Sequence, residues 1–222
     1  MTEDHDDHAH SHHDHDHHNG HSHDHSRAPH DWHSQTYVDY WIKRDEGRND
    51  ERRPRIRQMV EMAKLPRDTP LTALDIGAGY GFVSEEVLRV FPQARVTLQD
   101  FSELMLARAR EHLAGWSEQL SFVLDDLTDP HWSERIGGSF DLIVSAIAIH
   151  NLRSQDKIAA CYRGIAGLLK PGAQFLDYDL FRTCGGIEAH IAMMQEAGMT
   201  RVSCAWDDGH ATIVVGHGKR AF

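Results

Sequence analysis

From Leu71 onward the chain alternates short apolar runs with segments of helical periodicity, and this alternation limits the possible folds more than any other feature. Five apolar runs have the length of buried strands: Leu71–Ile76, Arg95–Leu98, Leu120–Leu124, Phe140–Ser145 and Ala173–Tyr178. Helical patterns between them predict helices at Phe82–Val90, Ser102–Leu113, Pro130–Ile136 and Gln155–Leu168. Strands and helices that alternate in this way form a parallel sheet with helices on both faces. The sequence therefore predicts an α/β fold with a Rossmann-like, doubly wound sheet.

The end of the chain departs from this alternation. After a helix expected at Gly186–Glu196, two strand-like runs, Thr200–Trp206 and Thr212–Gly216, are joined through Asp207-Asp208-Gly209. An Asp-Gly turn between two such runs is typical of an antiparallel hairpin. We therefore expect a mostly parallel sheet that finishes with a reversed edge strand.

Composition divides the chain into three zones. Residues 1–33 contain 13 of the 19 histidines, together with eight acidic residues and only one basic residue. A segment with so few apolar side chains cannot offset its ordering entropy, so we expect a disordered tail. Residues 34–66 predict two helices, at 34–43 with Ser34 as the N-cap and at 50–64, which we interpret as a lid. Residues 67–222 form the main domain.

Charge and composition argue against several classes of partner. The tail carries −7 of the formal net charge of −11, which leaves −4 on the rest and no basic surface for nucleic-acid phosphates. No apolar run approaches the ~20 residues of a membrane span, and the N-terminus has no apolar signal-peptide core. The three cysteines (Cys161, Cys184 and Cys204) lack CxxC spacing, which indicates reduced thiols. We expect a cytoplasmic monomer or homodimer without nucleic-acid or membrane partners.

A glycine-rich turn follows the first apolar run, with the sequence Asp75-Ile76-Gly77-Ala78-Gly79-Tyr80-Gly81. Glycines let the backbone bend sharply and approach a ligand closely. The spacing departs from the dinucleotide pattern G-x-G-x-x-G, because Phe82 stands where the last glycine would allow close helix–strand packing. This departure disfavours a pyrophosphate and NAD-linked oxidation. It favours a ligand with a carboxylate and an amine, which Asp75 would neutralise directly or through water.

Acidic residues follow the second and third apolar runs. Asp100 lies 19 residues beyond Gly81, a position from which a carboxylate accepts hydrogen bonds from both ribose hydroxyls, and Phe101 beside it is suited to cover an adenine face. Asp100 has the alternative role of a helix cap, although Ser102 is able to fill that role. Asp126 is equally well explained as an acceptor for an adenine amino group and as a turn acid.

The fourth apolar run ends in His150 and Asn151. Open α/β sheets bind ligands at the carboxyl ends of their strands, so we expect His150 in the site.

Together these four elements, in this order, resemble the class I methyltransferases that use S-adenosylmethionine (SAM). The resemblance covers Leu71–Gly216, and its most specific parts are Asp75–Gly81, Gln99–Ser102, Phe140–Asp141 and Leu168–Ala173. It implies SAM as cofactor and a small molecule as methyl acceptor. The cofactor-binding residues that it implies are Asp75, Gly77, Ala78, Gly79, Gly81, Asp100, Phe101, Asp126, Leu127 and Ser145.

Methyl transfer from a sulfonium is an in-line displacement, so the enzyme mainly orients the reactants. A base is needed only when the acceptor is poorly ionised. The candidates are His150 first, then Asp177 or Asp179, while Tyr37 is suited to shape the acceptor pocket. The sequence leaves O-, N- and carboxyl-methylation open.

Two further features concern the acceptor. Only Phe181–Gly186 separates the fifth strand from the next helix, whereas many relatives that act on bulky lipids or quinones carry a long insertion there. This argues against a large acceptor. Arg52 and Arg53 are able to hold an acceptor carboxylate, but a salt-bridged helix face explains them better.

The tail offers many overlapping imidazole and carboxylate groups. Divalent Ni, Zn, Co and Cu prefer imidazole ligands, so we expect metal binding, although a charged solubilising tail is the plain alternative. The predicted ligands are His5, His8, His10, His12, His13, His15, His17, His18, His21, His23 and His25. A disordered tail supplies no fixed geometry, so such a metal is not catalytic. The alternative function is a metal-binding or delivery protein on a methyltransferase-like scaffold, but the intact Asp75, Gly77, Gly79 and Asp100 favour an enzyme.

Overall fold

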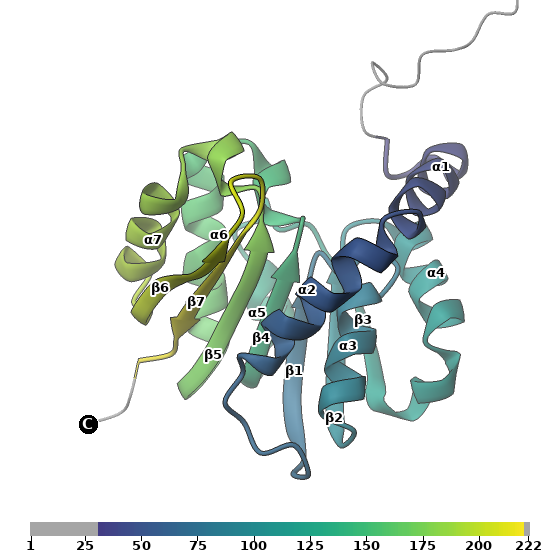
Figure 1. Cartoon of the computed structure of the whole chain (residues 1–222), viewed down its shortest axis with the longest axis horizontal. Helices are drawn as coiled ribbons and strands as arrows, with labels where there is room; N and C mark the ends of the chain where they lie inside the picture. The colour runs from purple at the N-terminus through teal and green to yellow at the C-terminus, as the bar shows by residue number, and fades with distance from the viewer. Residues whose placement is uncertain (1–30, 220–222) are drawn as a thin grey trace, which may run out of the picture. The chain divides into compact units, whose positions relative to one another are not determined.

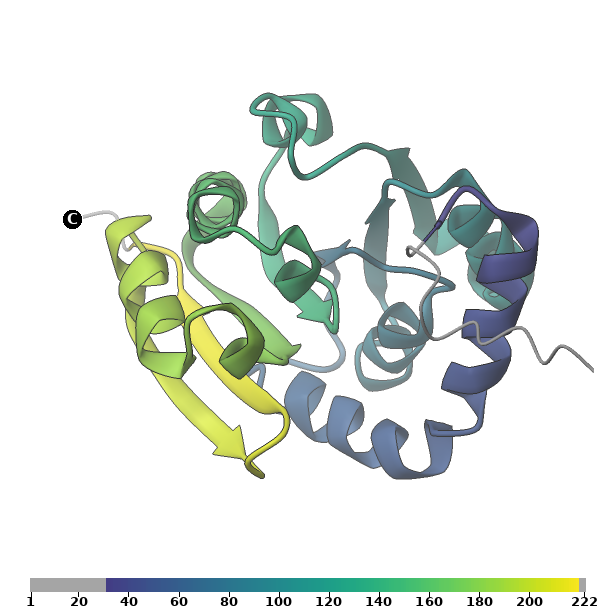
Figure 2. The same ribbon diagram turned by 90° about the horizontal axis from the view of Figure 1, so that it is seen from above.

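The computed structural model describes residues 31–219, and a compact unit begins at Asp31. Its centre is a seven-stranded sheet in the order β3-β2-β1-β4-β5-β7-β6, with helices on both faces (Figure 1, Figure 2). The strands are β1 (Leu71–Ile76), β2 (Ala94–Asp100), β3 (Leu120–Leu124), β4 (Phe140–Ala146), β5 (Leu169–Asp179), β6 (Thr200–Asp207) and β7 (Thr212–His217). The helices are α1 (Gln35–Glu46), α2 (Asn49–Glu61), α3 (Phe82–Val90), α4 (Glu103–His112), α5 (Trp132–Ile136), α6 (Gln155–Leu168) and α7 (Ile187–Glu196), and short 3-10 helices are η2 (Ala114–Gln119), η3 (Ile149–Leu152) and η4 (Phe181–Cys184). The predicted doubly wound α/β fold is confirmed.

Strand order places a ligand-binding edge at the middle of the sheet. β1 lies between β2 and β4 and runs parallel to both, with Ile76 level with Gln99 on one side and Ser145 on the other. The chain runs outward from β1 to β3 and then returns to β4 on the opposite side of β1. Open α/β sheets bind ligands at the carboxyl ends of the strands beside such a reversal. The glycine-rich turn leaves β1 at this edge.

The C-terminal hairpin is confirmed, but its order differs from the prediction. β7 is antiparallel to both β5 and β6, so the reversed strand lies inside the sheet and β6 forms the edge. The physical reason is burial: the apolar residues Ile213, Val214 and Val215 of β7 are buried, whereas most of β6 is exposed. A buried, apolar strand needs neighbours on both sides, since unpaired backbone groups are costly away from water.

Two hydrophobic clusters cover the faces of the sheet. One contains Ala73 and Leu98 with residues of α2, α3 and α4, and the other contains Leu74 and Ile76 with residues of α6 and α7. Neighbouring residues of β1 thus belong to opposite clusters, as the two-residue period of a strand requires. Among residues 31–219, the structure contains no helix with the length and hydrophobicity needed to cross a membrane.

The two predicted N-terminal helices are present as α1 and α2. Ser34 caps α1 as expected, because its hydroxyl accepts from the backbone N–H of Tyr37 at 3.5 Å. Helix α2 ends at Glu61, earlier than the expected residue 64, and its Ile56 and Met59 are buried in the core cluster of the sheet. Both helices therefore belong to the compact unit with the sheet.

Candidate active site

The glycine-rich turn has a backbone that side chains would disturb. Gly77, Gly79 and Gly81 have φ angles of +62°, +56° and +87°, in the left-handed region that favours glycine. A Cβ on Gly77 would lie 2.5 Å from the Cβ of Ala148, and one on Gly81 would lie 2.7 Å from Cδ1 of Leu113. A Cβ on Gly79 would meet no atom within 4 Å. Packing thus requires the outer glycines, while Gly79 leaves open space in which a ligand fits.

Gln99 of β2 holds the turn against the sheet. Its side-chain oxygen accepts from Gly77 N at 3.0 Å, its backbone oxygen accepts from Ala78 N at 2.9 Å, and its amide nitrogen donates to the Asp125 carbonyl at 2.6 Å. Gln99 is 1% exposed, so these bonds form away from water. Sequence reasoning quoted Gln99 only as part of a motif and missed this positioning role.

Asp75 is a buried carboxylate with an orphaned oxygen. The group is fully buried; Oδ2 accepts from Ser84 Oγ at 2.6 Å, whereas Oδ1 has no hydrogen-bond partner among the described residues. Burial raises the pKa of Asp75 to about 7, and the nearby charge of Asp100 adds to this effect. A cationic ligand would stabilise the ionised form. The orphaned oxygen therefore fits the ammonium group of a methionine-like ligand.

Asp100 joins the end of β2 to the glycine-rich turn. Its Oδ2 accepts from Gly79 N and its Oδ1 accepts from Ser102 N, both at 2.9 Å. Helix α4 is capped by Ser102, whose hydroxyl accepts from Met105 N, so the alternative role of Asp100 as the cap of α4 falls to Ser102. Burial raises the pKa of Asp100, and its backbone hydrogen bonds oppose that rise.

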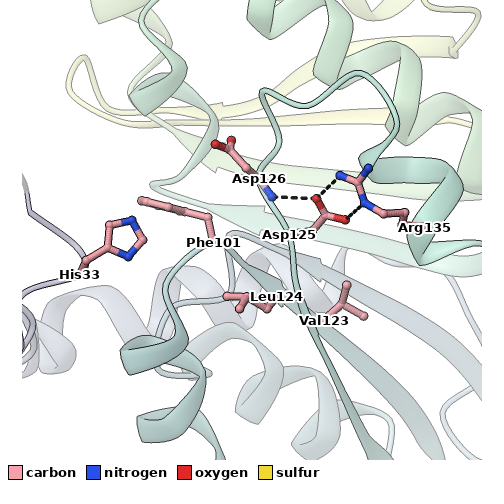
Figure 3. A pocket seen from close by; sticks show the side chains of 7 residues that line it. All are labelled: His33, Phe101, Val123, Leu124, Asp125, Asp126 and Arg135. Carbon is pink, nitrogen blue, oxygen red and sulfur yellow. Dashed lines mark hydrogen bonds and ion pairs between the residues drawn. The ribbon is translucent and has the colours of Figure 1, made fainter.

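A cavity of about 540 Å³ lies next to Asp100, and Figure 3 shows its lining. The residues around it are His33, Phe101, Val123, Leu124, Asp125, Asp126 and Arg135. Phe101 is 41% and Leu124 54% exposed, so both present apolar surface to the cavity. Asp126 Oδ1 accepts from Thr128 N at 2.8 Å, so Asp126 shapes its own turn and also lines the cavity. A cavity that combines the apolar side chains of Phe101, Val123 and Leu124 with the carboxylate of Asp126 suits an adenine, which has an apolar face and an amino group.

His150 and Asp179 form a hydrogen-bonded pair after β4 and β5. His150 Nδ1 lies 2.5 Å from Asp179 Oδ1, and the His150 backbone N–H donates to Asp179 Oδ2 at 2.9 Å. The Asp179 carboxylate is 1% exposed, whereas 15% of the His150 side chain is exposed. A carboxylate on Nδ1 fixes the tautomer in which Nε2 carries the lone pair. The pair therefore has the arrangement of an oriented general base.

The turn that carries His150 contains strained backbone. Ile147 has a φ angle of +52° and Arg153 one of +57°, both left-handed and neither glycine. For a β-branched residue this is an outlier, and such residues cost about 1–3 kcal/mol. Ile147 N donates to the Tyr178 carbonyl at 2.9 Å, and Ala148 packs against Gly77. The strained turn thus connects the glycine-rich turn to the His150–Asp179 pair.

Two predicted site residues are fully buried within strands. Ser145 is buried in β4, level with Ile76 at the sheet edge, and its hydroxyl donates to the Ile76 carbonyl at 3.1 Å. Asp177 is also fully buried, and burial together with the charge of Asp179 raises its pKa well above the usual range. Asp177 and Asp179 share one face of β5, but only Asp179, the last residue of the strand, reaches His150.

The remaining predicted residues lie at the margins of the site. Leu127 packs against the cluster that includes residues of α6 and α7 and does not line the cavity. The Tyr37 ring lies edge-on to Trp32, with 5.1 Å between the ring centroids. Burial raises the pKa of Tyr37, which opposes its use as a base near neutral pH.

The arginines of α2 form ion pairs, as the sequence favoured. Arg53 contacts both Glu85 and Glu86 of α3, and Arg52 contacts Asp45. Asp45 also accepts from the Tyr80 hydroxyl at 3.0 Å. The α1–α2 junction is therefore bonded to the glycine-rich turn itself.

No group of three or more His, Cys, Asp or Glu side chains suited to a metal ion occurs in the part of the chain that the structure describes. The predicted metal ligands, His5 to His25, lie outside those residues.

Comparison with known proteins agrees with this geometry. A family model described as "Methyltransferase domain" matches residues 74–175. Malonyl-[acyl-carrier protein] O-methyltransferase from Neorickettsia risticii is 40% identical over 87 residues, which are 39% of this chain and 32% of the relative. Trans-aconitate 2-methyltransferase from Rhodopseudomonas palustris is 35% identical over 107 residues, or 48% of this chain and 36% of the relative. The matches thus span about a third of the length of these curated relatives.

Solved structures share the fold. An O-methyltransferase family protein from Burkholderia thailandensis has a TM-score of 0.70 and 17% identity, covering 86% of this chain and 62% of its own. Human N-acetylserotonin methyltransferase, solved in complex with SAM, has a TM-score of 0.65 and 15% identity, covering 85% of this chain and 57% of its own. Residues 74–175 thus match a methyltransferase domain, and the fold is that of the class I SAM-dependent methyltransferases.

Proposed function

We propose that this protein transfers the methyl group of SAM to a hydroxyl oxygen of a small molecule. The observation that carries the proposal is the His150–Asp179 pair, which follows β4 and β5 at the sheet edge where the glycine-rich turn and Asp100 lie. A binding scaffold has no need of an oriented imidazole at that place.

The residues at the ends of β1 and β2 suit the methionine, ribose and adenine groups of SAM. Asp75 faces the ammonium group with its orphaned oxygen, and Gly79 leaves room for the methionine moiety. Asp100 takes the ribose hydroxyls, while Phe101 and Asp126 take the adenine. When bound, SAM would supply a methyl group on a sulfonium: an O–CH₃ bond would form to the acceptor as the S–CH₃ bond breaks and S-adenosylhomocysteine (SAH) leaves.

His150 supplies the one chemical step that the cofactor does not. An alcohol or phenol is mostly protonated near neutral pH, so its oxygen gains nucleophilicity when a base takes the proton. Nε2 of His150 accepts that proton, and Asp179 on Nδ1 stabilises the imidazolium that results. Such general-base catalysis contributes about 10²- to 10⁴-fold.

Helices α1 and α2, within residues 34–66, form the lid of the acceptor side in this proposal. The bond from Tyr80 to Asp45 ties the lid to the glycine-rich turn, and Tyr37 lies on α1. Only the short helix η4 (Phe181–Cys184) separates β5 from α7, which supports a small acceptor. Three free cysteines support a cytoplasmic location.

A carboxylate acceptor is the second candidate. The names of two relatives, malonyl-[acyl-carrier protein] O-methyltransferase and trans-aconitate 2-methyltransferase, contain acceptors that bear carboxylates. A carboxylate is already ionised at neutral pH and needs no base. Removal of the imidazole would then have little effect on the rate.

Calorimetric titration tests the cofactor, and an acceptor screen tests the reaction. We expect micromolar SAM binding to the full chain in the presence of a chelator, weakened at least tenfold (about 1.4 kcal/mol) in Asp100→Ala. Hydroxylated aromatics and carboxylic acids are then assayed with radiolabelled SAM. Absence of SAM binding would overturn the proposal.

Metal binding by residues 1–33 is a separate proposal that rests on the 13 histidines of that segment. Titration with Ni²⁺ tests it on the full chain and on residues 31–222, which form a compact unit. We expect metal binding to be lost on truncation while SAM binding is retained. A full chain that binds Ni²⁺ but not SAM would favour the metal-binding or delivery function on a methyltransferase-like scaffold.

A further inference from the structure

We propose that residues Asp31–Ser34, here named the strap, close the adenosine side of the cofactor pocket, with His33 in contact with the adenine. This inference rests on the proposed function and deepens it, because neither the family match at residues 74–175 nor the glycine-rich motif includes these residues. Three sets of contacts carry it.

The strap is tied to the residue that follows the ribose site. The Ser102 hydroxyl donates to the Trp32 carbonyl at 2.5 Å, across 70 positions of sequence. Ser102 also donates its backbone N–H to Asp100. The same residue therefore bonds to the strap and to the carboxylate proposed to hold the ribose, so the strap passes beside that carboxylate.

The strap has a defined conformation of its own. Ser34 N donates to the Asp31 carbonyl at 3.0 Å, and His33 N donates to Asp31 Oδ1 at 3.1 Å, which forms a tight turn. Trp32 anchors the turn through edge-to-face contacts with Tyr37 and Trp41 of α1, at centroid distances of 5.1 and 5.3 Å. This turn fixes where the side chain of His33 is presented.

His33 reaches the cavity as Figure 3 shows, on the side opposite the Asp125–Arg135 ion pair. Its ring stands edge-on to Phe101 with 5.7 Å between centroids and 86° between planes. Within residues 31–219 no group hydrogen-bonds to the imidazole nitrogens. Contacts within the protein alone therefore do not explain the position of this exposed ring. An adenine covered by Phe101 would give this ring an aromatic neighbour.

The strap affects SAM and SAH alike, because both carry adenosine. The strap therefore contributes to affinity for the nucleoside part and not to the methyl transfer itself.

Calorimetric titration of the full chain with SAH and with adenosine, in the presence of a chelator, tests the assignment. We expect His33→Ala to weaken both ligands by a similar factor, about fivefold (about 1 kcal/mol), and His33→Phe to stay within twofold of the native protein. The matched control is His210→Ala, which removes an exposed histidine from the β6–β7 turn and leaves both affinities unchanged.

The outcomes separate this inference from the proposed function. If the native protein fails to bind SAH, the proposed function falls and the strap assignment falls with it. If the native protein binds SAH and His33→Ala binds it equally well, only the strap assignment is overturned. Hydrogen exchange gives a second readout: SAH should slow exchange of the amides of His33 and Ser34, and unchanged exchange there also overturns the assignment.

Discussion

The two halves of the ligand-binding sheet edge are built by different means. At the ends of β1 and β2, backbone conformation dominates: left-handed glycines, held by Gln99 and Asp100, leave open space and N–H groups. At the ends of β4 and β5, side chains dominate, because a strained turn presents His150 to Asp179. The first half is suited to bind a ligand without reacting with it, and the second to move a proton.

This contrast also separates the features that suit a cofactor shared by many enzymes from the features that concern the acceptor of this protein. A glycine-rich turn with a carboxylate after the next strand suits a shared cofactor, and it lies within the stretch that matches the methyltransferase domain. In the proposed function, the surroundings of His150 and the helices α1 and α2 form the acceptor side. Variants of the two halves should therefore affect different measured quantities.

The largest expected effect is on the rate. His150→Ala should lower kcat for a hydroxyl acceptor about 10²- to 10⁴-fold with little change in the Kd for SAM, because the base is lost while the cofactor contacts remain. Asp179→Asn should lower kcat to a similar extent, since the imidazole loses both the carboxylate that fixes its tautomer and the charge that stabilises the imidazolium. Steady-state kinetics and calorimetry measure the two quantities. A rate that survives in His150→Ala would favour the carboxylate acceptor.

The next effect is on stability, in the binding half. Gly77→Ala places a Cβ 2.5 Å from that of Ala148 at a φ of +62°, whereas Gly79→Ala adds only the strain of a φ of +56°. We expect Gly77→Ala to lower the free energy of unfolding by about 3 kcal/mol and Gly79→Ala by about 1 kcal/mol. Urea unfolding measures both. Gly79→Ala should nevertheless weaken SAM binding, because its methyl group enters the open space.

A third effect concerns pH and again belongs to the binding half. Burial raises the pKa of Asp75 to about 7, so below pH 7 the carboxyl group must release a proton when an ammonium group binds beside it. The affinity for SAM should fall as the pH drops below 7, by up to about tenfold per unit, and level off above it. Calorimetry in buffers of different ionisation enthalpy should detect the released proton.

The same group makes a prediction for the protein without ligand. In the unfolded chain Asp75 ionises near its usual pKa of 3.8, whereas the folded protein keeps the proton up to about pH 7. The folded state therefore binds more protons between these values, so its stability falls as the pH rises through this window. Asp75→Asn should remove that part of the pH dependence. An unchanged pH profile in this variant would show that Asp75 is not the group responsible.

Local sequence accounts for the parts of the site that form within a few residues. The turn at Gly77–Gly81 and the carboxylate of Asp100 were placed correctly at the sheet edge, because strand ends and glycine spacing are local properties. The hydrogen bonds of individual side chains were less predictable: Ser145 bonds to the Ile76 carbonyl of the neighbouring strand, and Asp179, two residues beyond Asp177 on the same face of β5, is the carboxylate that pairs with His150.

Contacts distant in sequence explain what was missed. Gln99 bonds to a residue 26 positions away, and Trp32, next to His33, is bonded across 70 positions. His33 also lies at the end of a histidine-rich segment, where composition hid its contact with Phe101. The sequence predicted the final hairpin as well, but the choice of β7 as the neighbour of β5 depends on which strand gains more burial.

The smallest expected effect tests whether the backbone strain beside His150 contributes to the rate. Ile147→Asn replaces a β-branched residue at a φ of +52° by one that tolerates this region, so relief of strain should raise the free energy of unfolding by at most about 1 kcal/mol. Arg153→Asn relieves the same kind of strain at an exposed position and serves as the matched control. If the turn holds Ala148 against Gly77 in order to aim His150, Ile147→Asn should lower kcat several-fold while Arg153→Asn leaves it unchanged. If both variants have equal rates and Ile147→Asn is more stable, the strain is a consequence of packing. The contrast between the two halves then rests on His150 and Asp179 alone.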